Sequence, residues 1–490
     1  MLIQPIAART VATPPLALDA ASRFVDRALG VVAPVGRGEG VTTLLMMMNV
    51  FVLLSCYYVL KVVREPLILL GGGGAELKAY ASAGQTLLLL AVVPAFGALA
   101  SRVNRLRLLT IVQVCFIGCL VVFYVLAEAR APIGLAFYLW LGIFNVVIVS
   151  NFWSFATDLY RQDQGKRLFA IIGLGGSVGA ILGALVPQHL HRLIGSYQLL
   201  LVAAGGLAVS NALYRIVSRR ELRARAAESP VAAPAPEAVQ SVGREGGFRL
   251  VIGDRYLRLM AVMLLVATVI NTTGEYVVGK MATEQSRAYA VDQVASAPLE
   301  VRADPAATAA ATQHARDAYI RSFYSDYYAV VNLLSALLQA LVVSRLLGKL
   351  GIRRALFLMP VMVLGGWLAF FGFASVATIR ITKASENSLD YSLHNTLRQA
   401  LYLPTSRASK YKAKAAIDTF FFRMGDVIAG LGVVFVLVDV LGLGVRAFAA
   451  LNIVLSVLWL WLARRTGRLH DERTAERAHR AAQGLRETAL

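Results

Sequence analysis

Ionisable and polar residues are concentrated in one run at 379–402, IRITKASENSLDYSLHNTLRQALY, within a chain that is 57% hydrophobic. On a helix, which turns by about 100° per residue, the ionisable side chains of this run fall on one stripe. A charged side chain at the centre of a membrane costs about 2.5–3.5 kcal/mol, whereas a Leu or Ile returns only about 0.3–0.6 kcal/mol. A membrane-spanning helix must therefore turn the stripe toward a hydrated cavity or charged partners; a helix on the membrane surface is the alternative. The stripe contains Lys383, Glu386, Asn387, Asp390, His394 and Arg398.

Ionisable residues also interrupt other apolar stretches. Lys61 and Arg64 lie in the first stretch, where Arg64 and Glu65 could also reach the outer surface from the helix end. Asp158 could instead cap its helix or pair with a basic neighbour, Arg161 or Arg167. The remaining residues of this kind are Glu275, Lys280, Arg423 and Asp426, of which the last two, one turn apart, could form an intrahelical pair.

Cations and carboxylates within these stretches nearly balance in number. We interpret them as a pathway in which the cations contact protein carboxylates when it is empty and substrate anions when it is loaded. Opposite charges also lower the cost of burying one another. The pattern predicts a binding site for a small anionic solute. The candidate site residues are Lys61, Arg64, Asp158, Glu275, Lys280, Lys383, Glu386, Asp390, Arg398, Arg423 and Asp426.

Twelve apolar segments carry these residues, and each segment has close to the length of roughly 20 residues that crosses a bilayer. A 490-residue chain of this composition carries more apolar sequence than one soluble core can use. We therefore expect an all-α membrane protein with twelve transmembrane helices. The polar run supplies the tenth, without which the basic C-terminal residues would face outward. The segments are 41–64, 77–100, 106–127, 134–157, 167–190, 197–216, 258–280, 322–347, 353–374, 377–402, 415–438 and 443–464.

The formal charge of +20 is spread mainly over short loops in alternate connections, which argues against nucleic acid as a partner. Connections on the other side hold only scattered basic residues such as Lys78 and Arg130. This asymmetry predicts that both termini and the basic loops lie in the cytoplasm.

The twelve segments divide into two sixes that resemble each other. Basic turns follow the second and the eighth segments, GALASRVNRLR at 97–107 and SRLLGKLGIRR at 344–354. Two parallel six-helix halves joined by a central linker are the organisation of the major facilitator fold. The predicted parts are a cytoplasmic N-terminal segment, 1–40, with an interfacial helix or a plain tail at 17–32; a half at 41–216; a cytoplasmic linker at 217–257; a half at 258–464 with an outer loop at 283–320; and a cytoplasmic tail at 465–490.

Glycines at 175, 179 and 183 follow a GxxxGxxxG pattern, which favours close helix packing. A phosphate-binding loop is the alternative, but no strand precedes the pattern and no Lys-Ser/Thr follows it. The three cysteines fall in apolar segments and indicate neither a disulfide nor a metal site, and no cofactor is indicated.

Four stretches resemble the ATP/ADP translocases, nucleotide transporters of intracellular bacteria and plastids. They are YYVLKVVREPLIL, FWSFATDLYRQDQGKRLFAIIG, VINTTGEYVVGK and SKYKAKAAIDTFFFRMGD. The resemblance implies a facilitator-like fold, a bacterial inner membrane, and transport roles for Arg64, Asp158 and Glu275. A fourth position, a Lys in that family, falls on Asp426 and reverses the local charge. The stripe at 383–398 could supply the missing cations.

We therefore expect a membrane transporter that exchanges ATP for ADP or a similar nucleotide pair. Lys61, Arg64, Lys280, Lys383 and Arg398 are candidate phosphate contacts, and Tyr57, Trp153 or Tyr391 could stack a base. The alternative is a proton-coupled transporter of a non-nucleotide solute, in which Glu275, Asp390 or Asp426 carries the proton and His394 relays it. An enzyme is disfavoured, because the sequence shows no metal-ligand cluster, nucleophile motif or soluble catalytic domain. The oligomeric state is left open.

Overall fold

The computed structural model describes residues 16–30, 35–36, 38–100, 105–160, 162–195, 197–227, 247–405 and 413–487, and every regular element in these ranges is a helix. By length and composition, eight helices could cross a membrane, or nine if a pair bent by 75° counts as one span, α12 (Ser344–Ala355) with α13 (Leu358–Gly372). Three further helical segments coincide with the remaining predicted spans. They are α3 (Gly74–Ala100), the run from α14 (Val376–Leu389) to α15 (Asn395–Ala400), and the run from α16 (Lys414–Ala416) to η5 (Ile428–Val440).

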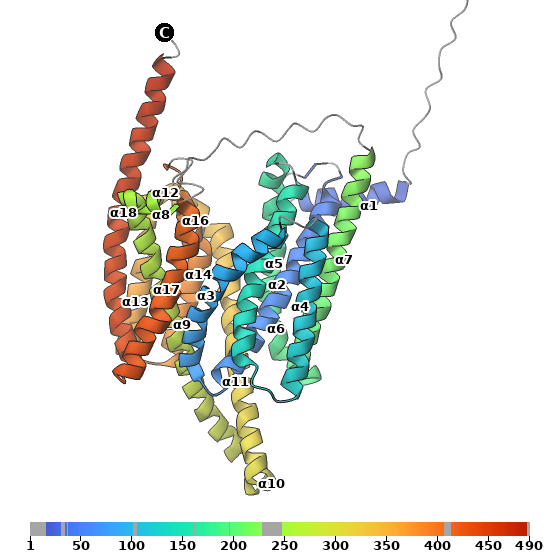
Figure 1. The fold of residues 1–490 in the computed structure, drawn as a ribbon, viewed down its shortest axis with the longest axis vertical. Coiled ribbons are helices and arrows are strands. Elements are labelled where there is room, and N and C mark those ends of the chain that lie inside the picture. The colour runs from blue at the N-terminus through green and yellow to red at the C-terminus, as the bar shows by residue number, and fades with distance from the viewer. Residues whose placement is uncertain are drawn as a thin grey trace, which may run out of the picture.

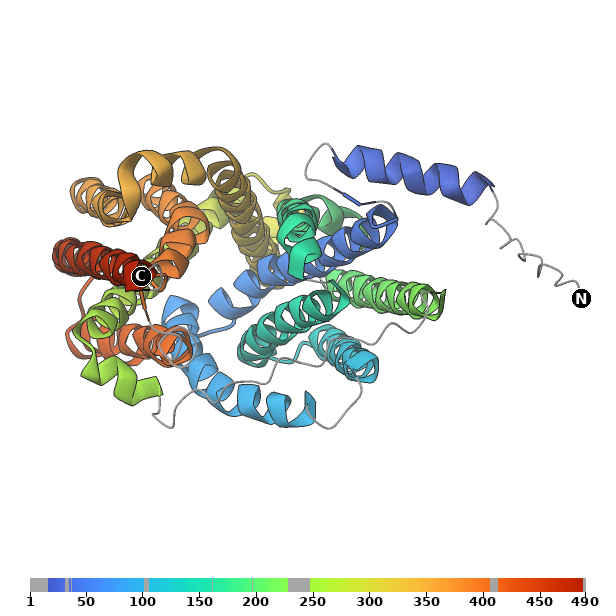
Figure 2. The same cartoon turned by 90° about the horizontal axis from the view of Figure 1, so that it is seen from above.

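The helices form two groups that lie side by side (Figure 1; Figure 2). The first group, here the N half, follows the peripheral helix α1 (Leu16–Gly30); the second is the C half. The N half contains α2 (Gly40–Leu69), α3, α4 (Arg105–Glu128), α5 (Gly134–Leu159), α6 (Gln162–Ile194) and α7 (Gln198–Ala227). The C half contains α8 (Gly247–Gly253), α9 (Arg255–Ala295), α10 (Leu299–Ala303), α11 (Pro305–Leu337), η1 (Leu338–Val343), α12, α13, α14, η2 (Asp390–His394), α15, α16, η4 (Ile417–Phe421), α17 (Phe422–Val427), η5 and α18 (Val445–Glu487).

The polar run at 379–402 lies inside the bundle and not on its surface. Ser375 caps α14, because its Oγ accepts a hydrogen bond from the Thr378 N–H at 3.1 Å. The helix then packs against α9, α11 and α13, and its backbone changes to a π-helix at Asp390–His394. Such π-helical turns often occur at functional sites. The surface-helix alternative is therefore wrong for this segment.

The segment predicted as an outer loop, 283–320, is a helical hairpin. Helices α9 and α11 extend beyond the bundle and meet through α10 (Figure 1). The helix α11 begins at Pro305, and Asp304 caps it by accepting a hydrogen bond from the Ala306 N–H at 2.9 Å. We call this end of the molecule the hairpin side; the opposite end, where α1 and the end of α18 lie, is the terminal side.

Three predicted connections differ from expectation or lie partly outside the described residues. The basic turn at 344–354 is the short helix α12, whose regular geometry breaks at Gly351 with a φ of 68°, a conformation that glycine adopts readily. Its counterpart at 97–107 includes residues 101–104, which are outside the described ranges. Residues 228–246 of the predicted linker at 217–257 are also outside them, between the end of α7 and the start of α8.

The glycine row of α6 packs directly on α2. A Cβ atom at Gly175, Gly179 or Gly183 would overlap the main-chain carbonyl oxygens of Met47, Phe51 and Ser55, respectively. The Ser55 hydroxyl also donates a hydrogen bond to the Gly179 carbonyl at 3.1 Å. The repeat thus brings two backbones together, which favours packing over a phosphate-binding loop.

Gly179→Ala is expected to destabilise the N half by about 1–3 kcal/mol, because the backbone of α2 must move to admit the new methyl group. The thermal unfolding midpoint of the detergent-purified protein measures this. Gly205→Ala on α7 is the matched control, since open space surrounds that position. Equal midpoints for the two variants would contradict close α2–α6 packing.

Glu39 links the start of α2 to α6 on the terminal side. Burial raises the pKa of its carboxyl, but hydrogen bonds from the Gly36 N–H, Gln164 and Arg167 outweigh burial and hold the pKa below 4.5. A lowered pKa stabilises the fold above the unfolded-state value, and this contribution disappears as the pH falls through the folded-state value. Glu39→Gln is therefore expected to lower the unfolding midpoint slightly at pH 7. The difference from the wild type should close below about pH 4.

Of the two hydrophobic cores, one belongs to the N half alone, and the other continues from the C half into the N half. One core lies entirely within the N half. The other fills the C half and takes in the second part of α2 and the start of α3. Between the halves, α3 packs on α9, α17 and η5, and α6 packs on α11. Ser325 on α11 donates to the Ala184 carbonyl on α6 at 2.6 Å. Two six-helix bodies are thus joined along these helices.

Candidate functional site

A cavity of about 280 Å³ lies between the halves. The N half supplies its walls from α2, α3 and α5, and the C half from α9, α11, α13, α14, η2 and α17. Of the eleven candidate residues predicted from the sequence, five line this cavity: Lys61, Arg64, Glu275, Asp390 and Asp426. The structure therefore gathers side chains from α2, α9, η2 and α17 that are distant in the sequence.

Lys61 is a buried cation that has no carboxylate partner among the described residues. Its Nζ lies 4.1 Å from the centre of the Tyr328 ring and 5.2 Å from that of Tyr58. Aromatic faces attract cations, but more weakly than a carboxylate does at this depth. The other cations predicted inside the spans, and Arg380 at the start of the polar run, each lie within 4.0 Å of a carboxylate; they are Arg64, Lys280, Arg380, Lys383, Arg398 and Arg423. Within the described part of the chain, Lys61 alone of these seven has no ion pair.

Arg64, one turn after Lys61, contributes a second cation to the same wall. Its guanidinium lies 4.4 Å from the centre of the Tyr138 ring and pairs with Glu65. Glu65 is fully buried and also accepts from Lys78 Nζ at 2.6 Å and from the Tyr328 hydroxyl at 3.0 Å. One carboxylate thus holds two cations of the N half and a tyrosine of the C half.

Carboxylates line the opposite wall. Glu275 accepts hydrogen bonds from Asn387 Nδ2 at 2.9 Å and the Tyr327 hydroxyl at 3.4 Å. Asp426 accepts from the Thr272 hydroxyl at 2.6 Å and lies 3.7 Å from Arg423. Asp390 lies in the π-helical turn. The cavity therefore has a basic wall on the N half and an acidic wall on the C half.

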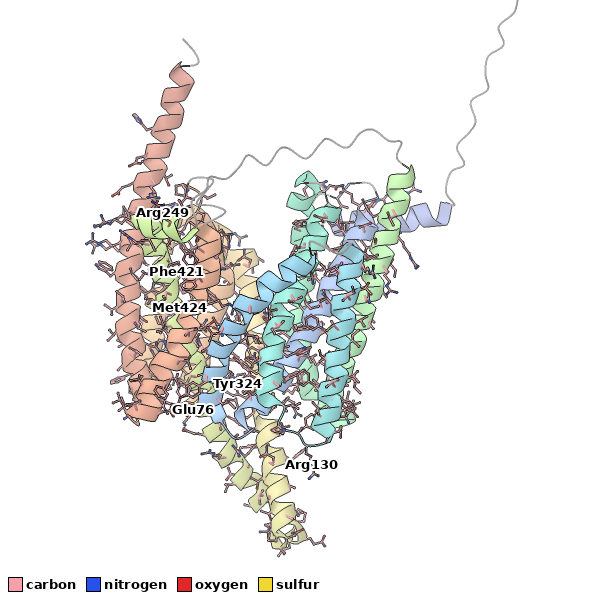
Figure 3. The ribbon with its side chains drawn as sticks, viewed as in Figure 1. Glu76, Arg130, Arg249, Tyr324, Phe421 and Met424 are labelled. Carbon is pink, nitrogen blue, oxygen red and sulfur yellow. The ribbon has the colours of Figure 1, made fainter. Side chains whose placement is uncertain are left out.

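The other candidate residues do not line this cavity. Lys383 is fully buried behind its wall, where its Nζ donates to Glu386 at 2.7 Å and to the Asn271 carbonyl at 3.2 Å. Lys280 pairs with Glu76 at 2.6 Å on the hairpin side. Figure 3 places Glu76 and Tyr324 where the halves meet on that side, far from Arg249 on the terminal side.

Two candidate residues lie toward the terminal side. Arg398 is 4.0 Å from Asp418, at the end of the polar run. Asp158 is exposed at the last turn of α5. Of its two predicted basic partners, Arg161 is outside the described residues, and Arg167 lies 3.3 Å from Glu39.

Sequence reasoning missed several residues at the cavity. Lys78 was expected as a scattered loop residue, but it is buried on α3 and ion-paired. Tyr138 and Tyr328 also line the cavity, and Tyr324 and Tyr327 form hydrogen bonds with Lys78 and Glu275. The spacing of the α11 tyrosines, at i, i+3 and i+4 in YSDYY, was the signal that could have indicated one helix face.

A second cavity, of about 450 Å³, adjoins the first and shares Tyr57, Lys61 and Tyr391 with it. The three aromatic residues predicted as candidates for base stacking, Tyr57, Trp153 and Tyr391, all line it. Amide side chains of Asn145, Asn332 and Gln339 provide polar groups in a wall that is otherwise mainly apolar. Lys61 therefore lies where a charged region meets an aromatic one.

This arrangement of two six-helix halves around a central cavity is the major facilitator fold, and the chain is an integral membrane protein of this fold class. A bacterial homologue of the human lysosomal transporter Spinster, inward-facing and unoccupied, matches with a TM-score of 0.54 and 13% identity over 88% of this chain and 97% of its own. The nucleoside transporter NupG matches with a TM-score of 0.56 and 11% identity, over 87% and 99%. A peptide transporter POT in complex with sulfate matches with a TM-score of 0.55 and 15% identity, over 87% and 95%.

No protein-family model matches the sequence, and the search of curated proteins finds no significant relative. At these identities the structural similarity defines the fold alone.

Proposed function

We propose that this protein transports a small anionic solute that carries a phosphate group, and that it does so by alternating access. Exchange of ATP for ADP, or of a similar nucleotide pair, is the activity that the resemblance to ATP/ADP translocases favours. The protein would act in a bacterial inner membrane with both termini in the cytoplasm. The observation that carries the proposal is the ammonium of Lys61, which no described carboxylate pairs with, on a cavity between the two halves.

An unpaired buried cation is costly unless an anion completes its environment. Lys61 and Arg64 are one helical turn apart on α2, and both line the cavity, so one phosphate group could contact both. Hydrogen bonds between charged groups contribute about 1.5–3 kcal/mol each, which is sufficient to select an anion over a neutral analogue.

The second cavity supports a substrate with a planar, aromatic part. Stacking of a base on an aromatic side chain contributes about 1–3 kcal/mol. Tyr57 and Tyr391 line both cavities, so a base in the second cavity would place its phosphate beside Lys61. Known structures of this fold include a nucleoside transporter and peptide transporters, which supports small-molecule transport as the general function.

The contacts between the halves support alternating access. On the hairpin side the halves are linked by Glu76 with Lys280, by Glu65 with Tyr328, and by α6 with α11. Because the N half has a core of its own, breaking these links and the shared packing could let the halves rotate as rigid bodies. The present conformation would then be the one closed on the hairpin side.

A panel of ligands tests the proposal on the detergent-purified, full-length protein. ATP, ADP, AMP, sugar phosphates, inorganic phosphate and amino acids are each added, and the thermal unfolding midpoint is measured, since a ligand that binds only the folded state raises it. We expect nucleotides to raise the midpoint and to support counterflow in liposomes. A shift with another anion alone would reject the nucleotide, and the absence of a shift with every anion would reject the anionic solute.

Proton-coupled transport of a non-nucleotide solute is the second candidate, because Glu275, Asp390, Asp426 and His394 line the same cavity. In that case transport should be driven by an imposed pH gradient and should not be inhibited by excess nucleotide. ATP/ADP exchange predicts the opposite result in both assays.

A further inference from the structure

We infer that the transported solute binds with a fixed polarity. Its anionic group contacts the basic wall of the N half, and a hydrogen-bond-donating group at its other end, such as an ammonium or the hydroxyls of a ribose, contacts the acidic wall of the C half. This inference rests on the proposed function and specifies the substrate class further.

The charges that line the cavity are segregated by half. Its cations come from α2 and α3, namely Lys61, Arg64 and Lys78, and its carboxylates come from α9, η2 and α17, namely Glu275, Asp390 and Asp426. A site for a simple anion would need only the first set. With the second set, the cavity is positively charged on the wall of the N half and negatively charged on the wall of the C half.

The carboxylates retain the capacity to accept hydrogen bonds from a ligand. The described side chains that donate hydrogen bonds to Glu275 are neutral, Asn387 and Tyr327. Asp390 forms no ion pair or side-chain hydrogen bond with any described residue, and it is partly exposed to the cavity. A carboxylate has about four positions for hydrogen-bond donors, so both Glu275 and Asp390 can accept a hydrogen bond from a ligand.

The acidic wall also disfavours a solute that carries negative charge at both ends. Negative charge placed between the two walls would be attracted by Lys61 and repelled by Glu275 and Asp390. A solute that carries a donor group opposite its anion satisfies both walls. The same solute would link the halves across the cavity, and this gives it different contacts in the open and closed conformations, as a transported substrate requires.

Matched pairs of ligands test the polarity directly. Aminoalkyl phosphates with two to six methylene groups are compared with alkyl phosphates of equal length, which differ only in lacking the ammonium. Dissociation constants come from the thermal shift of the full-length protein over a range of ligand concentrations. At the best length, we expect the aminoalkyl phosphate to bind at least tenfold more tightly than its alkyl counterpart.

Asp390→Asn and Glu275→Gln should remove this tenfold advantage, and they should not weaken the alkyl phosphate, because each removes a charge that repels it. Lys61→Ala should weaken both ligands of a pair equally. The unfolding midpoint without ligand serves as the control for folding, and Asp390→Asn leaves no partner unpaired among the described residues.

The possible results separate the two proposals. If both ligands of every pair bind equally and Lys61→Ala weakens both, the fixed polarity is wrong and the anionic-solute function stands. The polarity is also wrong if the advantage persists in both carboxylate variants. If neither series binds and nucleotides also fail to bind, both proposals are wrong.

Discussion

Lys61→Ala is expected to weaken binding of the transported anion by roughly ten- to hundredfold and to abolish its thermal stabilisation at concentrations that saturate the wild type. Removing a charge-assisted hydrogen bond costs about 1.5–3 kcal/mol, which corresponds to this range. The remaining cations cannot replace it, because Arg64 and Lys78 already share the charge of Glu65. Ligand titrations of the purified variant and uptake into liposomes measure the two effects.

Arg380→Ala is the matched control for Lys61→Ala. Arg380 is also a cation of a membrane-spanning segment, but it pairs with Asp326 at 3.7 Å and does not line either cavity. The Arg380→Ala variant should bind the anion as the wild type does. Lys61→Arg keeps the charge on a longer side chain and should retain part of the binding. If Lys61→Ala and Arg380→Ala reduced transport equally, the loss would be a general effect of removing charge, and the unpaired ammonium would not be the anion site.

The spans could be predicted from the sequence because the free energy of crossing a bilayer is a local property. A run of about 20 apolar residues is sufficient evidence for a span, and the cost of a charge at mid-membrane identifies side chains that must face the interior. Lys61, Glu275 and Asp390 were found in this way, and all three line the cavity. The polar run at 379–402 was placed inside the bundle by the same argument.

The partners of these charges could not be predicted, because they depend on which helices pack together. Lys383 pairs with Glu386 on its own helix, although Glu275 was an equally plausible partner from sequence. Lys78 lies near the beginning of a span, where a loop position and a buried position look alike, and only the approach of α3 to α2 and α11 buries it.

The spacing of the α11 tyrosines could indicate a shared helix face, but not the role of any one of them. Placing a tyrosine in an apolar span costs little free energy. Tyr328 therefore cannot be distinguished by sequence from a residue that only packs against its neighbours. In the structure it has two roles, because its hydroxyl donates to Glu65 and its ring lies beneath Lys61. This position connects the anion site with a contact that joins the two halves.

Glu65→Gln is expected to open the hairpin side. Glu65 is fully buried and holds Arg64, Lys78 and Tyr328 together. Removing one partner of a buried ion pair costs about 3–5 kcal/mol, because it leaves uncompensated charge. If the closed conformation is destabilised by this amount, the ratio of closed to open molecules falls by at least a hundredfold. The variant should lose transport while it remains folded.

Distances between spin labels on the hairpin side measure this opening. Labels are attached at Arg130→Cys in the N half and Arg446→Cys in the C half, two exposed positions, after the three native cysteines are replaced. Figure 3 shows Arg130 on the hairpin side. The distance distribution should be short in the parent protein and should shift to longer distances in Glu65→Gln.

The order of effects among three variants tests the role of burial in this opening. Tyr328→Phe removes only the hydrogen bond that crosses between the halves, which contributes about 1.5–3 kcal/mol, so it should open the hairpin side less than Glu65→Gln does. Glu76→Gln breaks the pair with Lys280, whose side chain is 36% exposed, and exposed ion pairs contribute only about 0–1 kcal/mol. Its distance distribution should stay close to that of the parent. If Glu76→Gln opened the hairpin side more than Glu65→Gln, the exposed pair would hold the halves together, and the buried cluster around Glu65 would only stabilise the N half.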